Sequence, residues 1–487
     1  MRKMAFLLVA IFAIVIPSTA ARAKTTSPTF TNFQLGAASV GQTCPSKTPR
    51  CVNGAAEPAI RANLAGEFYG SSENGLSAGT EAWRSTTGGL SYTHLLSPNQ
   101  VSTVAPGAPN NISPAGGDTD LAVASAKNTK GNYNVYVSSL ELANVAVSTS
   151  QDKGASWSIN PKAATISGDD REWIAAEGAS KVCISYRDLA AIGIHVDCSL
   201  DAGTTFLQEG EAQDTNHVYT RTNFEIGNLA IDPKNHYVYQ TFSSIDSGDT
   251  VNCQNPTSTQ CNFHVVYMAV STDGGKTFTD YPVYDNPNRS VSYGHQFVNV
   301  SVDKAGNVYS VYCDNHNIYY SVSTNHGKTW SAPSRVNSFA ANTAIFPWST
   351  VLAPGKIDIV YYGTAFYDGK TAPDAYPVTA KWYVYFAQDL AATTNHNFTQ
   401  TQATPQYIHS GGVCEGGVTC TGNSSANRDL FDDFGVAANP LTGKASIIYS
   451  DDQNDPSQPQ QCTEAQDNTA QCNHTNIATQ LGGPVIK

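Results

Sequence analysis

The chain has 487 residues, with 40 acidic side chains against 28 lysines and arginines, which gives a formal net charge of −12. An acidic chain of this kind is a poor partner for nucleic acid or for an anionic membrane surface. Only 14% of the residues are charged, and Gly, Ser, Thr, Asn and Tyr are abundant, which is typical of an extracellular all-β protein.

The N-terminus predicts a secretory signal peptide over residues 1–23. Arg2 and Lys3 precede an apolar run from Ala5 to Ile16 that is too short to span a membrane, and Ala21-Arg22-Ala23 is a small-x-small cleavage site. We therefore expect the protein to be secreted or periplasmic, without insertion into a membrane.

The N-terminal part of the exported chain contains one segment of β-type residues, from Thr29 to Leu35. Seven similar units follow it, and each begins with an apolar strand. These first strands start near Glu57, Asp118, Arg171, Ile226, Phe297, Pro347 and Asp433. Each unit has room for four strands that alternate with period two. The seventh unit is one strand short, because its third strand nearly reaches the end of the sequence.

A closed ring resolves this shortage. If the segment from Thr29 to Leu35 completes the last sheet, the chain forms a β-propeller of seven four-stranded blades without exposed sheet edges. We accordingly assign residues 24–56 to the closing strand and a stapled loop, and residues 57–487 to the propeller. Six blades or two packed β-sandwiches are the alternatives.

The eleven cysteines predict disulfides in an exported protein. Four pairs are close in sequence, namely Cys44/Cys51, Cys253/Cys261, Cys414/Cys420 and Cys462/Cys472. Cys183 and Cys198 lie on consecutive expected strands, and Cys313 is left over. No Cys-x2-Cys pair has a partner, so these spacings favour structural disulfides over a zinc site.

An octapeptide of the form Ser-x-Asp-x-Gly-x-Thr/Ser-aromatic recurs five times. Three copies match fully, and Asn325 and Thr87 replace the Asp in the other two. The copies are Ser85–Tyr92, Ser150–Trp157, Ser199–Phe206, Ser271–Phe278 and Ser323–Trp330. Gly permits a tight hairpin turn, and the Asp carboxylate can accept backbone N–H bonds within it. The replacement of Asp indicates a structural role, because a catalytic carboxylate would not tolerate it.

This motif resembles the Asp-box, or BNR repeat, of the sialidase superfamily, which implies a propeller with the boxes on its periphery. The element Asp170-Arg171-Glu172-Trp173 is similar to one found in secreted bacterial sialidase-like proteins. Sialidases have six blades, an Arg-Ile-Pro element and three arginines that clamp the substrate carboxylate. Here seven blades are expected, and the first one reads Ile60-Arg61-Ala62-Asn63.

Propeller topology places the repeated turns on one face, called here the lower face, and the long connections on the opposite, upper face. These long connections are Leu95–Gly116, Ser244–Cys261, Gly363–Ala380, Thr399–Arg428 and Asp451–Cys472. The last of them contains the acidic run Asp451–Asp455, for which we expect a solvated loop rather than a calcium site. Long loops gathered on one face usually carry the binding function.

The upper ends of the first strands converge on the mouth of the central channel. Carboxylates there can serve as the acid and the second carboxylate of glycoside hydrolysis, and the candidates are Glu57, Asp118, Glu172 and Asp433. Other charged and aromatic residues can contact a sugar or its carboxylate, namely Asp120, Asp170, Arg171, Trp173, Arg187, Glu225 and Trp348. The alternative for each of these residues is an ion pair or hydrogen bond that plugs the mouth.

Two functions follow from this set of residues. The first is a monomeric, sialidase-like propeller that binds or hydrolyses a glycan or glycoconjugate at its mouth, as an exo-glycosidase would, without a cofactor or metal. The second is a non-catalytic propeller that binds a protein or a cell-surface glycan through its long loops.

Overall fold

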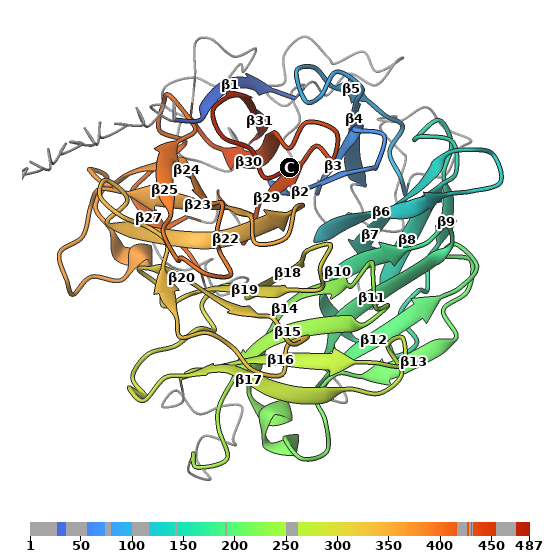
Figure 1. Cartoon of the computed structure of the whole chain (residues 1–487), viewed down its shortest axis with the longest axis horizontal. Helices are drawn as coiled ribbons and strands as arrows, with labels where there is room; N and C mark the ends of the chain where they lie inside the picture. Colours follow the sequence, from blue (N-terminus) through green and yellow to red (C-terminus); the bar gives the residue numbers. More distant parts are fainter. Residues whose placement is uncertain are drawn as a thin grey trace, which may run out of the picture.

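The computed structural model describes residues 27–35, 56–73, 79–99, 116–141, 144–189, 192–249, 262–415, 426–427, 430, 432–453 and 474–487. They form seven four-stranded antiparallel sheets around a central channel (Figure 1). The prediction of an all-β, seven-bladed propeller is confirmed, and the alternatives of six blades and of two sandwiches are wrong. Helical segments among these residues are short 3-10 turns, including Val218–Thr222 and Pro373–Ala375.

Each blade runs from an inner strand at the channel to an outer strand at the rim. Blade 1 contains β2 (Ala56–Ala62), β3 (Phe68–Glu73), β4 (Thr80–Ser85) and β5 (Thr93–His94). Blade 2 contains β6 (Thr119–Lys127), β7 (Tyr133–Leu140), β8 (Val145–Ser150) and β9 (Ser158–Asn160). Blade 3 contains β10 (Asp169–Glu177), β11 (Lys181–Asp188), β12 (Gly193–Ser199) and β13 (Gln208–Glu211). Blade 4 contains β14 (Phe224–Ile231), β15 (Val238–Ser244), β16 (Val265–Ser271) and β17 (Thr279–Asp285). Blade 5 contains β18 (Asn299–Val302), β19 (Val308–Cys313), β20 (Ile318–Ser323) and β21 (Ser334–Arg335).

The last two blades carry the additions to this plan. Blade 6 contains β22 (Thr343–Val351), β23 (Ile357–Thr364), β24 (Lys381–Asp389) and β25 (Thr399–Gln402), and β26 (His409–Ser410) also pairs with β24. Blade 7 contains β29 (Gly435–Ala438), β30 (Ala445–Asp451), β31 (His474–Gly482) and β1 (Thr29–Gln34). A separate two-stranded parallel pair consists of β27 (Gly412–Val413) and β28 (Ala426–Asn427).

The ring closes through the N-terminal strand. β1 pairs antiparallel with β31, with Asn32 opposite Ala478, and so forms the outer strand of the last blade. This pairing is the one predicted from the missing strand of the seventh unit. It leaves the propeller without an open edge between its first and last blades.

The core lies between successive blades, so most strands are buried on both faces. β15 and β16, for example, are buried at every position. A cluster around Tyr136, Ile174 and Ile184 joins blades 2 and 3 in the same way. Burial on both faces explains why these strands contain small and apolar residues in succession rather than a strict polar alternation.

The five repeated turns have one shared hydrogen-bond pattern. In blade 4, Ser271 donates its hydroxyl to Asp273 Oδ1 at 2.7 Å, and the amides of Gly275 and Thr277 donate to Ser271 Oγ and Asp273 Oδ1 at 2.8 and 3.0 Å. The Asn325 turn reproduces the last bond through its amide oxygen at 3.0 Å, and the Thr87 turn does so through its hydroxyl at 2.9 Å. These hydrogen bonds close the hairpin, and the carboxylate has a structural role in them.

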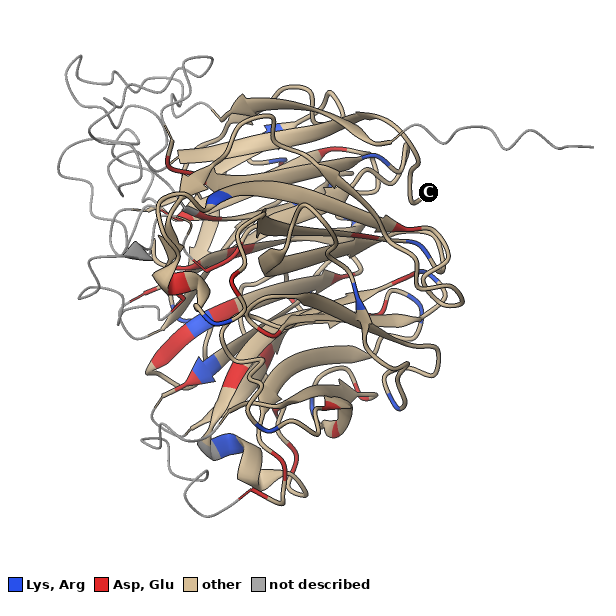
Figure 2. Ribbon diagram, turned by 90° about the vertical axis from the view of Figure 1, so that its left-hand side faces the viewer, with Lys and Arg blue, Asp and Glu red and all other residues tan. Residues whose placement is uncertain are grey.

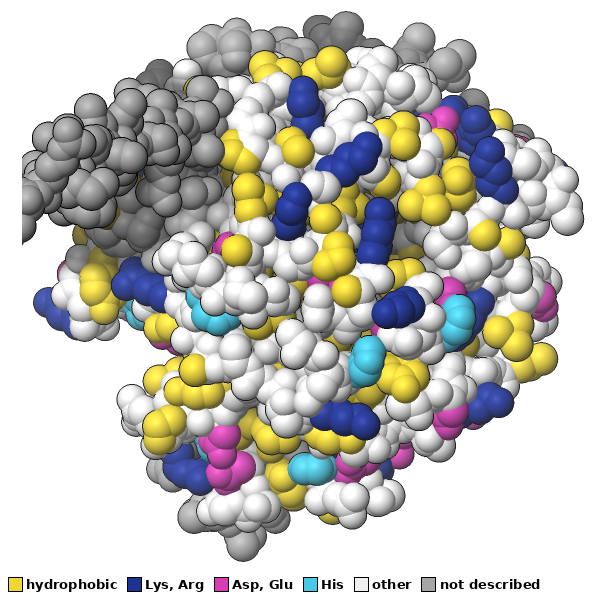
Figure 3. All heavy atoms as spheres, viewed as in Figure 1, with side chains coloured by type: hydrophobic (Ala, Val, Ile, Leu, Met, Phe, Trp, Pro, Cys, Tyr) yellow, Lys and Arg dark blue, Asp and Glu magenta, His cyan; other side chains and the backbone are white. Residues whose placement is uncertain are grey.

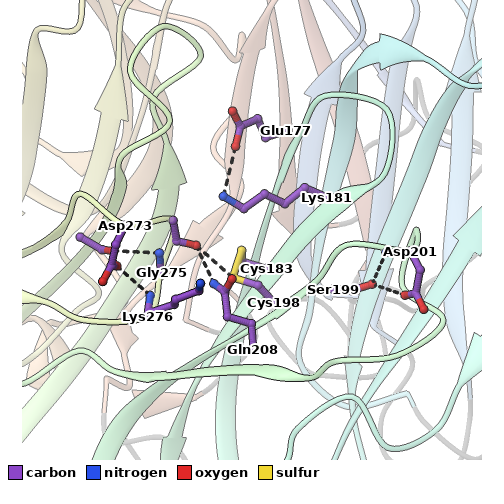
Figure 4. Close-up of a disulfide and its surroundings, with 12 residues drawn as sticks. Glu177, Lys181, Cys183, Cys198, Ser199, Asp201, Gln208, Asp273, Gly275 and Lys276 are labelled. Carbon is purple, nitrogen blue, oxygen red and sulfur yellow. Dashed lines mark hydrogen bonds and ion pairs between the residues drawn. A yellow bond between two sulfur atoms is a disulfide. The ribbon is translucent and has the colours of Figure 1, made fainter.

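A disulfide between Cys183 on β11 and Cys198 on β12 lies beside the repeated turn of the next blade (Figure 4). Gly275 has a φ of +104° there, and a Cβ atom on it would lie 3.1 Å from Cys198 Sγ, so both the conformation and the space require glycine. Gln208 of β13 donates to the carbonyl of Gly274 at 2.7 Å and joins the two blades.

The other cysteines agree with the sequence analysis where they are described. Cys313 is a free, buried thiol, as expected for the residue left over. Cys414 is disulfide-bonded. The predicted pairs Cys44/Cys51, Cys253/Cys261 and Cys462/Cys472, together with Cys420, lie outside the described residues, as does the expected signal peptide.

The strand register separates the two faces. Ser244 at the end of β15 lies opposite both Phe224 at the start of β14 and Val265 at the start of β16. The connection between second and third strands therefore leaves at the upper face, where the first strands begin, and the repeated turns lie at the opposite end. Charged residues gather near the left-hand side in Figure 2, which is the upper face. No helix in the described part of the chain is long and apolar enough to cross a membrane.

The repeated turns yield a stability prediction. Asp273→Ala removes the acceptor of four hydrogen bonds, and we expect the free energy of unfolding to fall by about 1 to 2 kcal/mol. Asp273→Asn copies the natural Asn325 turn and should lose less than half as much. Urea unfolding followed by tryptophan fluorescence at pH 7 measures both, and an Ala variant as stable as the Asn variant would contradict the role assigned to the carboxylate.

The same carboxylate predicts a pH dependence. Partial burial opposes ionisation, but hydrogen bonds from Thr277 and Ser271 outweigh it and lower the pKa of Asp273 to about 2. The stability that the charged form adds is therefore present above the unfolded pKa of about 3.9 and is lost as the pH falls towards 2. The difference between the wild type and Asp273→Asn should shrink over that interval.

Candidate functional site

The channel mouth is built from the starts of the inner strands. Glu57 lies in β2, Asp118 directly precedes β6, and Asp170 and Arg171 lie in β10. β14 and β29 bring further carboxylates, Glu225 and the pair Asp432 and Asp433. Because all inner strands begin at the upper face, residues far apart in the sequence meet in one ring around the channel.

Arg171 is the centre of this ring. Its Nη1 atom donates to Glu57 Oε2 at 2.9 Å, and its Nη2 atom donates to Asp433 Oδ2 at 2.7 Å. Asp118 Oδ2 lies 3.6 Å from Nη1. One buried guanidinium therefore joins blades 1, 3 and 7 and comes close to blade 2, which is a strong arrangement for a charge removed from water.

The backbone explains why Arg171 points to the channel. The register of β10 against β11 shifts between Asp170 and Glu172, which makes Arg171 the extra residue of a β-bulge. Its φ is +56°, in the left-handed region that non-glycine residues rarely adopt. Glu57, its partner in β2, has a φ of +47° at a similar register shift. The two bulges aim the ion pair across the channel.

An aromatic floor lies under the guanidinium. The Arg171 guanidinium carbon is 4.2 Å from the ring centre of Trp173 and 4.4 Å from that of Phe297. Trp173 also packs against Trp348, with ring centres 5.2 Å apart, and Arg61 lies over Trp348 at 5.3 Å. Trp173 and Trp348, expected from sequence as stacking faces for sugars, are buried in this floor.

Two of the sequence-predicted carboxylates lie behind the mouth rather than in it. Glu172 is fully buried, and neither of its carboxylate oxygens has a hydrogen-bond partner. Burial and the nearby Asp118 raise its pKa well above the usual range. Asp120 is also buried, and it accepts bonds from Arg61 at 2.8 Å and from the amide of Leu121 at 2.8 Å.

Glu57 and Asp433 are buried against Arg171, and their pKa values are raised as well. Burial is the largest cause for both, with Arg171 acting in the opposite direction, and the pKa of Asp433 is about 7. Neighbouring acids add to the effect, Asp118 for Glu57 and Asp120 for Asp433. These two carboxylates hold the arginine.

The carboxylates that face solvent form a second set. Asp170 is exposed, Asp432 is half-buried, and the side chains of Asp118 and Glu225 are 19% and 23% exposed. Burial raises the pKa of Glu225 to about 7 against the opposing effect of Arg187, whose Nη1 atom lies 3.9 Å from Glu225 Oε2. A carboxyl that is half protonated at neutral pH beside a half-exposed arginine is suited to proton transfer.

Two acidic residues of this region escaped the sequence analysis. Glu73 ends β3, and one oxygen each of Glu57, Glu73 and Asp118 lies within 4.8 Å of the others. Glu415 follows β27, and burial raises its pKa well above the usual range, while Gln296 donates a hydrogen bond to it. The only signal for both in the sequence is their position at the upper ends of strands or in long upper loops.

Three groups of described residues have the spacing of metal ligands. The group at the mouth is Glu57, Glu73 and Asp118, and the others are Asp214, His217 and Asp280, and Asp246, Asp249 and His264. A guanidinium already supplies the positive charge in two of them, from Arg171 at the mouth and from Arg289 in the third. In these two groups the carboxylates therefore already have a cationic partner.

Comparison with known proteins gives the following. No family model matches the chain, and no curated protein matches it. Among solved structures, the chain is similar to a protein of unknown function from Dyadobacter fermentans, with 12% identity over 88% of this chain and 94% of that one, at a TM-score of 0.43. It is also similar to the GH93 α-L-arabinofuranosidase of Fusarium graminearum, with 11% identity over 93% and 98% of the chains, at a TM-score of 0.45. The α-L-arabinanase of Penicillium chrysogenum shows 10% identity over 94% of this chain and 98% of that one, at a TM-score of 0.43.

The central ion pairs predict a large and specific effect of Arg171→Met. This change leaves Glu57 and Asp433 buried without their cation, and we expect the free energy of unfolding at pH 7.5 to fall by about 3 to 5 kcal/mol. Because the folded state then gains protons on these acids, the deficit should decrease as the pH is lowered from 7.5 to 5.

Arg187→Met is the matched control for this change. Its guanidinium is half-exposed and lies 3.9 Å from a single carboxylate, so its loss should lower the unfolding free energy by less than about 1 kcal/mol. Equal effects of the two substitutions in urea unfolding would overturn the central role of Arg171.

Proposed function

We propose that this chain is an exported propeller that binds and hydrolyses a glycan at its channel mouth, with Glu225 as the general acid. The observation that carries the proposal is the partly exposed Glu225 carboxyl, whose pKa is raised to about 7 by burial. Enzymes that cleave glycosidic bonds need such a carboxyl to protonate the leaving oxygen at neutral pH. The disulfide between Cys183 and Cys198 is consistent with export.

Asp118 supplies the second carboxylate in this proposal. It is partly exposed, and its Oδ2 atom lies 3.6 Å from the Arg171 guanidinium, so its charged form has a cationic neighbour. Asp170 is close enough to interact electrostatically with both Asp118 and Glu225. Glu225 gives its proton to the glycosidic oxygen as the C–O bond breaks, and water adds to the anomeric carbon and gives its proton to Asp118.

The remaining residues of the mouth then have supporting roles. Glu57 and Asp433 fix Arg171, and Glu172 lies beneath the surface, where burial raises its pKa. Trp173 forms the floor with Trp348 and keeps the guanidinium at the level of the mouth. Asp120 fixes Arg61 at the edge of the same floor.

The charges of the mouth favour a neutral sugar over a carboxylated one. Sialidase-like recognition uses several arginines on one substrate carboxylate, but Arg171 is buried and bonded to two carboxylates already. Arg187 is a half-exposed arginine at the mouth, and it lies near Glu225 and opposite Asp170 in the pairing of β10 with β11. An anionic sugar would meet more carboxylates than guanidinium groups there.

A non-catalytic glycan-binding propeller is the second candidate. The observation in its favour is that the buried carboxylates Glu57 and Asp433 are already bonded to Arg171, which packs on the rings of Trp173 and Phe297. Turnover separates the two functions.

The test is a screen of fluorogenic glycosides, both neutral ones and sialosides, with the purified protein. We expect turnover of a neutral glycoside, a kcat lowered by about 10²- to 10⁴-fold in Glu225→Gln, and a fall in wild-type kcat as the pH rises through about 7, where Glu225 loses its proton. Glu209→Gln, an exposed change on β13, is the control and should retain kcat.

Each outcome decides between the candidates. Absence of turnover on every substrate, with binding of glycans retained, would favour the non-catalytic propeller. Wild-type kcat in Glu225→Gln would remove Glu225 as the acid while leaving the activity in place.

A further inference from the structure

A second concave site lies on the lower side of the aromatic floor. It is a cavity of about 330 Å³ between the lower halves of the inner strands, and Leu64, Pro233 and Pro440 of the lower turns contribute to its lining. Its walls are mostly apolar, with Ile174 and Val300 among them. This volume is at the lower end of the range of about 300 to 1,000 Å³ that small-molecule sites occupy.

Four of the polar side chains that line this cavity, those of Arg61, Asn228, Ser301 and Ser349, already have polar partners. Arg61 donates to Asp120 at 2.8 Å. Asn228 donates to the carbonyl of Val300 and accepts from its amide, at 3.2 and 2.6 Å. The hydroxyls of Ser301 and Ser349 lie 2.7 Å apart and bond to each other. A ligand in the cavity therefore meets apolar surface and few free hydrogen-bonding groups, which disfavours a sugar and suits a hydrocarbon.

Lysines surround the opening. The turn between first and second strands is at the lower face in every blade, and in six of the seven blades it carries or adjoins a lysine, namely Lys127 and Lys130, Lys181, Lys234, Lys304, Lys356 and Lys444. Figure 3 views this face and shows dark blue side chains around its centre, with the larger magenta patches nearer the edge.

Most of these lysines have no acidic partner. Lys181 pairs with Glu177 at 3.2 Å, but Lys234, Lys304 and Lys444 have no carboxylate within 4.0 Å among the described residues. Lys444 donates to the backbone carbonyl of Leu481 at 2.8 Å, and Lys356 donates to the main-chain oxygen of Lys487 at 2.6 Å.

The acids of the same turns point inward. Asp232 and Asp303 are buried and accept backbone amides, from Lys234 at 2.7 Å and from Ala305 at 2.8 Å. The centre of the lower face, around the opening, is thus locally cationic in a chain whose net charge is −12.

We propose that this cavity binds an anionic amphiphile, a small molecule with an apolar chain and a single carboxylate or sulfate head. The chain occupies the apolar cavity down to the Trp348 ring, and the head remains at the opening among the lysines. Apolar walls recognise the hydrocarbon, and the unpaired ammonium groups recognise the charge. The site is separate from the mouth, since the floor of Trp173, Phe297 and Trp348 lies between them.

The test uses dodecanoate, with dodecanol as the uncharged probe, in titration calorimetry on the full protein. We expect dodecanoate to bind more tightly than dodecanol, and added salt to reduce that difference. A four-lysine variant should bind dodecanoate about tenfold more weakly and bind dodecanol with unchanged affinity. It combines Lys234→Gln, Lys304→Gln, Lys356→Gln and Lys444→Gln. Lys276→Gln with Lys328→Gln, on repeated turns farther out in the blades, is the matched control and should change neither.

A fluorescence experiment places the ligand. 12-Bromododecanoate should quench tryptophan emission, and Trp348→Phe should remove most of that quenching while leaving the calorimetric affinity within about twofold. Ala176→Phe, at a partly exposed wall position, should block both probes. No dodecanoate binding below its micelle concentration, equal affinity in the four-lysine variant, or quenching unchanged in Trp348→Phe would each overturn the proposal. None of these results affects the glycoside assay.

Discussion

The buried guanidinium of Arg171 is the interaction on which the channel depends. It is bonded to Glu57 and Asp433 of two other blades and packed on the rings of Trp173 and Phe297. A charge buried in this way is stable only while all its partners keep their places. The inner strands of three blades are therefore held at a fixed spacing, and the solvent-facing carboxylates above them have a rigid base.

The same interaction divides the molecule into two chemically different ends. Above the floor, carboxylates outnumber arginines, and burial raises the pKa of several of them, that of Glu225 to about 7. Below the floor, the inward orientation of Asp232 and Asp303 leaves lysines at the surface. Because the two ends are separated by packed aromatic rings, a ligand at one end has no direct contact with a ligand at the other.

Most of the fold could be predicted from the sequence, because the blades repeat features that depend on nearby residues. These features are strands with alternating side chains and a turn whose hydrogen bonds form within eight residues. The closing strand Thr29–Gln34 could be assigned because the seventh unit lacked a partner. The mouth could be predicted only as a set of residues. Its pairing depends on the bulge at Arg171, which alternation does not encode, and on contacts between distant blades. For the same reason Trp173 is buried below the mouth, and the pKa of Glu225 follows from burial that no spacing reveals.

The pairing of β1 with β31 has a consequence for how the protein folds. Strand β1 has to wait for nearly the whole chain before its partner β31 exists, so the ring cannot close until β31 has been synthesised. Bringing β1 and β31 together lowers the conformational entropy of the chain before any contact between them forms, which makes folding slow. Until that moment β31 presents a free sheet edge, the kind of surface that chaperones cover and that aggregates extend.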